Sequence, residues 1–217
     1  MNGSISVRRM IGVLVVCWPA AVAAQAGLEQ ATYDSLAPSG IQFDLGALAG
    51  HDFYGTLVGG VRFDAGFLAP RLRLLAGLSY AKSSFSGSSI ARLNSQLQKL
   101  VQDPDSNAQI DVGKITLADL TAEVDLQYVF PQGKRFWTYL GLGAGVHFRN
   151  GNGPGINGTF VEDALDGVAP ALNATLGLEY ALTPPWRLTL DLRGMLLSDF
   201  STASVRVGAM YRFPGAR

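Results

Sequence analysis

Cysteine is almost absent from this sequence: the only one is Cys17, inside an apolar segment near the N-terminus. A disulfide framework and thiol chemistry are therefore excluded for the rest of the chain. A lipid-modified cysteine is the alternative, but Val16 before it is not a small residue and Trp18 follows it. Cys17 is therefore interpreted as an ordinary apolar residue of its segment.

The sequence also has few histidines, and its basic and acidic residues balance. The two histidines, His51 and His147, are too few for a His-rich metal site, so no metal and no cofactor are expected. Lysine and arginine together number 17, as do aspartate and glutamate, and the basic residues form no stripe along the chain. A nucleic-acid partner is therefore not expected.

Long apolar runs are missing after residue 24, so the later sequence offers no candidate for a membrane-spanning helix. Residues 1–24 begin with a basic region at Arg8 and Arg9, continue with an apolar run and end in small residues. This order is typical of a cleaved secretory signal peptide. Residues 25–40 are then expected to form a short leader before the main domain.

Apolar and polar residues alternate with period two through the rest of the chain. The pattern is clearest at 117–130, where one side is Leu120, Ala122, Val124, Leu126, Tyr128 and Phe130, and the other is Asp119, Thr121, Glu123, Asp125 and Gln127. One such strand would also suit a half-buried soluble sheet. Eight of them in a secreted chain favour a closed barrel that meets lipid on its outside.

The eight predicted strands are 41–49, 57–67, 71–84, 114–130, 136–149, 168–181, 186–197 and 203–213. Their connections alternate between tight, proline-marked turns (68–70, 131–135 and 183–185) and a second set that includes two long loops (50–56, 85–113, 150–167 and 198–202). An even strand count with loops sorted in this way predicts an all-β, eight-stranded antiparallel up-and-down transmembrane β-barrel over residues 41–213. The tight turns and both termini are expected to face the periplasm, which makes residues 25–40 a periplasmic leader.

Aromatic residues gather at the tight-turn ends of these strands and are expected to form an interfacial girdle. They are Phe67, Tyr128, Phe130, Phe136, Trp137, Tyr180, Trp186, Tyr211 and Phe213.

Three strand segments carry a family resemblance: Tyr139 to Phe148, Thr175 to Tyr180, and Val205 to Phe213. With these segments the chain resembles the small OmpA-like outer-membrane β-barrel family, which includes the OmpX- and OmpW-like proteins. The last segment is similar to the C-terminal signal that such barrels present to the assembly machinery. The resemblance implies a Gram-negative-type cell outer membrane, contact with its lipids, the barrel assembly machinery as a partner during insertion, and a monomer.

Ionisable residues fall on the polar side of the predicted strands. The acids are Asp44, Asp64, Asp119, Glu123, Asp125, Glu179 and Asp191, and the bases are Arg62, Arg71, Arg73, Arg187, Arg193, Arg206 and Arg212. An eight-stranded lumen is only wide enough to be filled by side chains. Unpaired buried charge is costly, so a network of ion pairs is expected to plug the lumen. A gated ion path or a small-ligand site is the alternative.

The 85–113 loop holds the one helical pattern, formed by Ile90, Leu93, Leu97, Leu100 and Val101. Ser88 or Ser89 would cap this helix, and Asp103-Pro104 would end it. Its apolar stripe needs a partner: the helix would close the barrel mouth as a lid, lie on the outer leaflet, or dock an extracellular protein. The glycine- and asparagine-rich residues 150–158 are expected to form a mobile loop.

The leading functional hypothesis is a non-enzymatic outer-membrane barrel with a structural or surface-interaction role. A narrow porin-like conduit for ions or small solutes is the first alternative. A lipid-modifying enzyme would need His147 to meet Ser79 or Asn173, and because its same-face neighbour is Arg149, no catalytic residue is assigned. A soluble lipocalin-like barrel would require the apolar faces to point inward. The glycines Gly141, Gly143 and Gly145 would either make room for arginine side chains or leave a small cavity.

Overall fold

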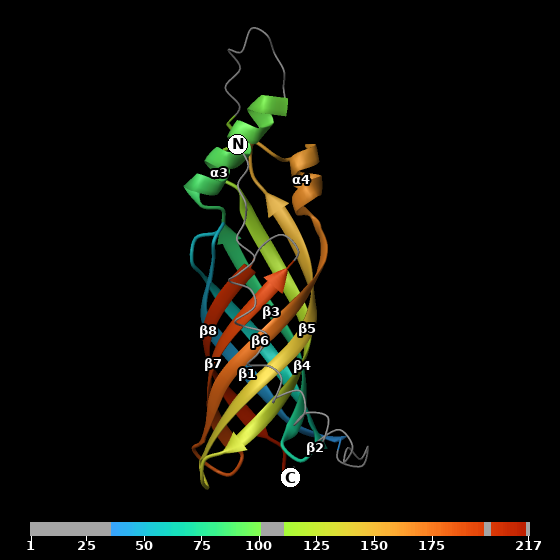
Figure 1. The fold of residues 1–217 in the computed structure, drawn as a ribbon, viewed down its shortest axis with the longest axis vertical. Coiled ribbons are helices and arrows are strands. Elements are labelled where there is room, and N and C mark those ends of the chain that lie inside the picture. Colours follow the sequence, from blue (N-terminus) through green and yellow to red (C-terminus); the bar gives the residue numbers. More distant parts are fainter. Residues whose placement is uncertain (1–35, 101–110, 198–200, 216–217) are drawn as a thin grey trace, which may run out of the picture.

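A computed structural model of the chain describes residues 36–100, 111–197 and 201–215. The strands form one closed barrel in which each strand pairs with the next in sequence and the first pairs with the last, all antiparallel. The predicted eight-stranded up-and-down barrel is therefore confirmed (Figure 1). The elements are β1 (Leu36–Gly50), β2 (Thr56–Ala69), β3 (Leu72–Ser84), α3 (Gly87–Leu100), β4 (Thr116–Pro131), β5 (Phe136–Asn152), α4 (Phe160–Leu165), β6 (Gly167–Ala181), β7 (Trp186–Leu197) and β8 (Ser201–Arg212).

The burial of side chains is inverted relative to a soluble protein. Outward-facing leucines such as Leu142 and Leu176 are 67% and 55% exposed, whereas inward-facing Asp191 and Arg193 are 0% exposed. The apolar side of every strand therefore faces away from the lumen, as the period-two pattern predicts. This placement is the opposite of what a lipocalin-like soluble barrel needs, so that alternative is wrong.

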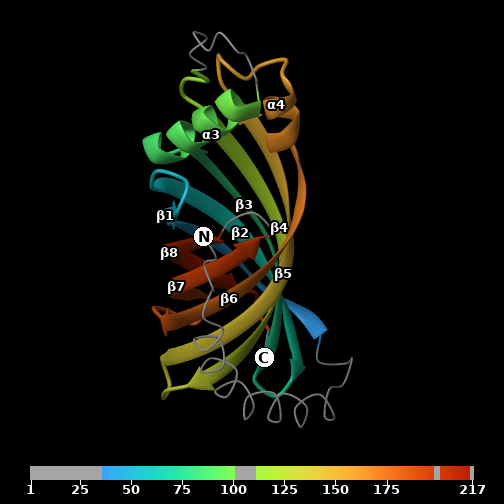
Figure 2. The same cartoon turned by 45° about the horizontal axis from the view of Figure 1, so that its top comes forward.

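The two ends of the barrel differ (Figures 1 and 2). At the tight-turn end, which also holds the C-terminal end of β8, the strands are joined by the turns at 70–71, 132–135 and 182–185. At the other end β4 and β5 extend beyond the other strands and carry α3 and α4. We call α3, α4, the segment 111–115 and the turn 153–159 the head.

Helix α3 lies where the sequence predicts a helix, and it packs within the protein. Its buried Leu97 joins Val112, Ile115, Ile156 and Val161 in a small core, against which Ile90 and Leu93 also pack. Ser86 Oγ accepts a hydrogen bond from the Ser89 amide at 3.3 Å, which is the contact of a capping side chain, so Ser86 rather than Ser88 or Ser89 caps the helix. Leu100 ends α3, and Val101 and Asp103-Pro104 lie outside the described residues.

Two expectations about connecting segments are corrected. Strand β1 begins at Leu36, with a bulge before Gly40, so the last residues of the predicted leader belong to the barrel. The 150–158 segment is not a featureless loop: Asn150 to Asn152 continue β5, and Ile156 is fully buried in the head. The predicted signal peptide, its cleavage zone and Cys17 lie outside the described residues.

Helix α4 is absent from the sequence-based prediction, although a local signal exists. Thr159 is its N-cap and accepts a hydrogen bond from Val161 N. Glu162, three residues later, accepts from Gly158 N at 2.6 Å. This Thr-x-x-Glu arrangement is close to a capping box, whose sequence pattern marks a helix start. The density of glycine and asparagine just before it concealed the signal.

Candidate functional site: the lumen and the head

The lumen at the tight-turn end contains a first cluster of charges. Arg73 contacts Glu179, and its Nη1 lies 3.8 Å from Asp64. Arg212 lies 3.5 Å from the same Asp64, and Arg187 lies 2.9 Å from Glu179. Both carboxylates are fully buried, so each is shared by two guanidinium groups away from water. This sharing lowers the cost of burying them.

A second cluster lies near the middle of the lumen. Arg62 contacts Asp191, and its Nε lies 3.2 Å from Asp44. Arg206 approaches the other oxygen of Asp44 at 3.3 Å. The hydroxyl of Tyr139 donates to Asp191, so this carboxylate is held from two strands that are not neighbours. The cluster ties β1, β2, β5, β7 and β8 together across the lumen.

A third cluster joins β4 to β7. Arg193 contacts Glu123 and lies 3.3 Å from Asp125. Asn173 on β6 completes it, with its amide nitrogen 3.4 Å from Glu123. Together the three clusters hold six carboxylates and six arginines, so their formal charges cancel.

Inward-facing glycines make this density of side chains sterically feasible. A Cβ on Gly77 would lie 2.8 Å from Arg62 Cγ, and one on Gly143 would meet Asp125 and lie 2.8 Å from Asn173 Oδ1. The space beside these glycines is therefore filled by charged and polar side chains. The alternative of a small cavity beside the glycines of β5 finds no support in these contacts.

Asp119 stands apart from the arginine clusters, nearer the head. Its Oδ2 lies 2.7 Å from Nδ1 of His147, and the same nitrogen lies 3.0 Å from Thr121 Oγ1. His147 is buried, and its Nε2 has no hydrogen-bond partner among the described residues. Ser79 and Met195 line a cavity of about 30 Å³ beside it. Such a volume holds about one water molecule, not a lipid substrate.

Three residues lie elsewhere than the sequence suggested. Arg71 is exposed in the β2–β3 turn with a φ of 70°, so it is not one of the inward bases. A bulge after Asp64 sets Phe67 opposite Arg73, on the inner side of the strand. Trp137 pairs with Glu179 on the inner side, and its ring lies 4.2 Å from the Arg187 guanidinium. Neither aromatic belongs to the outer girdle: the bulge turns Phe67 inward, whereas Trp137 faces inward because it follows the regular alternation of β5 with Tyr139 and Gly141.

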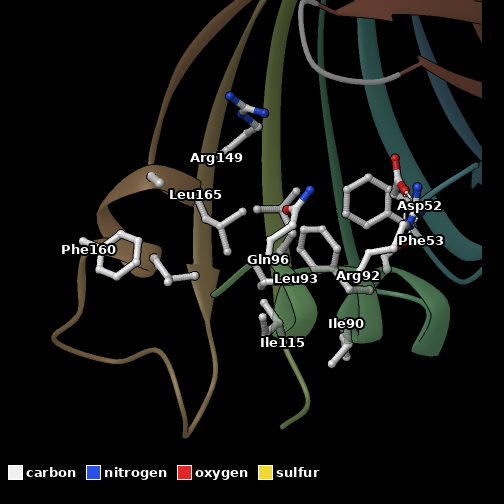
Figure 3. A pocket seen from close by; sticks show the side chains of 15 residues that line it. Asp52, Phe53, Ile90, Arg92, Leu93, Gln96, Ile115, Arg149, Phe160 and Leu165 are labelled. Atoms are coloured by element: carbon white, nitrogen blue, oxygen red, sulfur yellow. Dashed lines mark hydrogen bonds and ion pairs between the residues drawn. The ribbon is translucent and has the colours of Figure 1, made fainter. Parts of the chain in front are cut away.

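The head contains a pocket with a volume of about 390 Å³ (Figure 3). Apolar side chains from α3, α4, the β1–β2 connection and the extensions of β4 and β5 line it, joined by Asp52, Arg92 and Arg149. Sequence reasoning singled out Ile90 and Leu93 as a stripe but did not find the pocket, because its walls come from segments far apart in sequence.

No group of histidine, cysteine and carboxylate residues suited to holding a metal ion occurs within the described ranges. No helix in those ranges is long and apolar enough to cross a membrane.

A closed strand ladder with an apolar outer surface and charged side chains inside is the arrangement of an integral membrane barrel. The family model for the outer membrane protein beta-barrel domain matches residues 17–213. The chain belongs to this family, which places the barrel in the outer membrane.

Two solved structures of one protein, Ail, show the same fold at low sequence identity. Ail, the attachment invasion locus protein of Yersinia pestis, is 14% identical with a TM-score of 0.50, and the match covers 82% of this chain and 99% of Ail. A second structure of Ail, in complex with the heparin analogue sucrose octasulfate, is 13% identical with a TM-score of 0.51, covering 81% and 97%. The N-terminal barrel domain of Pseudomonas aeruginosa OprF is 14% identical with a TM-score of 0.40, covering 80% and 97%. Comparison with curated proteins found no match.

Proposed function

We propose that this protein is a non-conducting, non-enzymatic anchor that presents its head at the outer surface of the outer membrane. The observation that carries the proposal is the set of mutually paired, buried charges from the tight-turn end to beyond the middle of the lumen. In this orientation the tight turns and both chain ends face the periplasm, because outer-membrane barrels have short periplasmic turns and longer outer loops.

The partners proposed for the barrel itself follow from its surface. Outer-membrane lipids contact the exposed apolar side chains, and the barrel assembly machinery inserts the chain. A monomer suffices, because the strand ladder closes on itself and leaves no edge. The interaction role is assigned to the head on the basis of this chain's own structure, since the likeness to Ail is one of fold.

Planar-bilayer recording tests the closed lumen. The wild-type protein is expected to give no steady conductance, because an ion would have to break several buried ion pairs to pass. Glu123→Gln and Arg206→Gln alter the lumen, and Arg135→Gln, in an exposed turn, is the matched control. A steady wild-type conductance that changes with Glu123→Gln or Arg206→Gln but not with Arg135→Gln would establish the porin-like conduit instead.

Among the described residues, the pairing of His147 with Asp119 favours the alternative of a barrel enzyme, since it leaves Nε2 of the imidazole without a hydrogen-bond partner there. The adjacent cavity is too small for a lipid, so we assign this pair a structural role. Mass spectrometry of outer-membrane lipids from cells with wild-type protein and with His147→Ala is expected to give identical profiles. A lipid modification that disappears with His147→Ala would overturn the non-enzymatic assignment.

A further inference from the structure

The head pocket is apolar in its interior. Its walls include Phe53, Ile90, Leu93, Ile115 and Leu165, which come from different segments of the chain. In Figure 3 their side chains surround an open space between α3 and α4. At about 390 Å³ this pocket lies within the range of small-ligand sites, roughly 300–1,000 Å³.

The walls of the pocket are held by contacts that do not depend on a ligand. Phe53 and Phe85 form an isolated antiparallel bridge, and their ring centroids are 4.6 Å apart. Ile115 and Val161 line the pocket and also belong to the buried core of the head. The pocket is therefore built into the head and does not need to be opened by its ligand.

The pocket lining includes two basic residues, Arg92 and Arg149, and one acidic residue, Asp52. Arg92 is 57% exposed, and its contacts with Asp52 at 2.7 Å and Ser89 at 3.0 Å both use Nη2. A guanidinium has five N–H donors, so these contacts leave donors for a further acceptor. The pocket is thus apolar inside, and two guanidinium groups and one carboxylate belong to its lining.

The pocket lies next to the lipid-facing band. Leu120 and Phe148 pair on β4 and β5, and both are exposed on the outer face. Leu117 and Arg149, which line the pocket, lie just beyond this pair toward the head. The pocket therefore lies at nearly the same height along β4 and β5 as this outer pair, on the opposite face of the two strands.

We propose that the head pocket binds a single-chain amphiphile. The acyl tail lies among the apolar walls, and the anionic group of the ligand, a carboxylate or phosphate, lies at Arg92 and Arg149. This inference deepens the proposed surface role and rests on the head facing outward. It does not depend on a closed lumen, so a conducting lumen and an empty pocket are separate experimental results.

Isoleucine methyl NMR of the full protein in lipid nanodiscs tests the proposal, because the chain supplies its own reference. Ile90 and Ile115 line the pocket, whereas Ile41 lies near the tight-turn end of β1. Sodium decanoate is expected to shift the Ile90 and Ile115 signals saturably and to leave Ile41 unchanged. Decanol, with the same chain but no charge, is expected to bind about tenfold more weakly.

Two variants test the contributions of the ligand's acyl tail and of its anionic group one at a time. Ala164→Leu narrows the pocket and is expected to weaken decanoate binding, whereas Ala91→Leu, on an exposed part of α3 outside the lining, is the control. Arg92→Gln is expected to lower decanoate affinity about tenfold and leave decanol binding unchanged. Gln98→Ala, also exposed on α3, serves as its control.

The same spectra identify the source of the ligand. If nanodiscs that contain lipopolysaccharide shift Ile90 and Ile115 without added decanoate, the ligand is a membrane lipid. If only decanoate does so, it is a free amphiphile. Equal shifts at Ile41, no saturation, or equal affinities for decanoate and decanol would overturn the proposal.

Discussion

Inward-facing glycines leave the space that the charged side chains of the lumen occupy. Gly177 lies beside the Tyr139 ring, and a Cβ there would lie 2.6 Å from Asp191 Oδ1. Tyr139 and Asp191 are both buried, and the Tyr139 hydroxyl donates a hydrogen bond to Asp191. The lumen therefore tolerates no added methyl group at this position without moving a charged cluster.

Gly177→Ala is expected to lower the free energy of unfolding by about 1–3 kcal/mol, because the new methyl overpacks the central cluster. The measurement is equilibrium urea unfolding in lipid vesicles. Gly194→Ala is the control, since a Cβ there has no neighbour within 4 Å, and its effect is expected to stay within about 0.5 kcal/mol. Equal effects of the two variants would show that the lumen is not tightly filled at Gly177.

At the scale of elements, the barrel and the head have separate cores. The barrel interior is polar and ion-paired, whereas the head is held by a few apolar side chains around Leu97, Val112 and Ile156. A change in the head core should therefore loosen α3 and spare the strand ladder, because the two share few buried contacts.

Leu97→Ala is expected to speed amide hydrogen exchange in α3 by at least about tenfold, because deleting a buried leucine costs about 2 kcal/mol or more. Exchange in β6 and β7 is expected to stay unchanged. Gln98→Ala, on the exposed side of α3, is the control. If Leu97→Ala exposed the barrel strands as much as α3, the head and barrel would form one cooperative unit.

At the scale of the whole molecule, lipid is the solvent of the apolar outer face. The leucines and valines that point outward have no protein partner layer in the described structure, and the bilayer supplies the apolar surroundings that they need. The cost of an outward charge should therefore depend on its depth, which no soluble barrel would show.

Leu176→Lys, near the middle of β6, is expected to cost about 2–4 kcal/mol of unfolding free energy in lipid vesicles, against about 0–1 kcal/mol for Val168→Lys near the head end of the same strand. Both residues are exposed, so the two variants differ mainly in depth. Similar costs at both positions would contradict the placement of this strand across the bilayer.

The sequence predicts the strand order and most inward positions because the side-chain period of a strand is two residues. The alternation fails where the backbone departs from that period. The bulge after Asp64 moves Phe67 to the inner side, and the turn takes Arg71 out of the lumen. In the head, Ile156 is buried by segments distant in sequence. The local glycine and asparagine content therefore predicted a mobile loop at 150–158 instead of a buried residue.

By itself, the sequence determined that this chain forms an eight-stranded barrel with an apolar exterior, a charged interior and a helix in the 85–113 loop. It did so because alternation and turn chemistry are local properties of the chain. Only the tertiary structure decided which carboxylate meets which arginine, that His147 pairs with Asp119, and that α3 and α4 enclose a pocket. These contacts depend on closing the barrel, which brings side chains from non-neighbouring strands and loops within reach of one another.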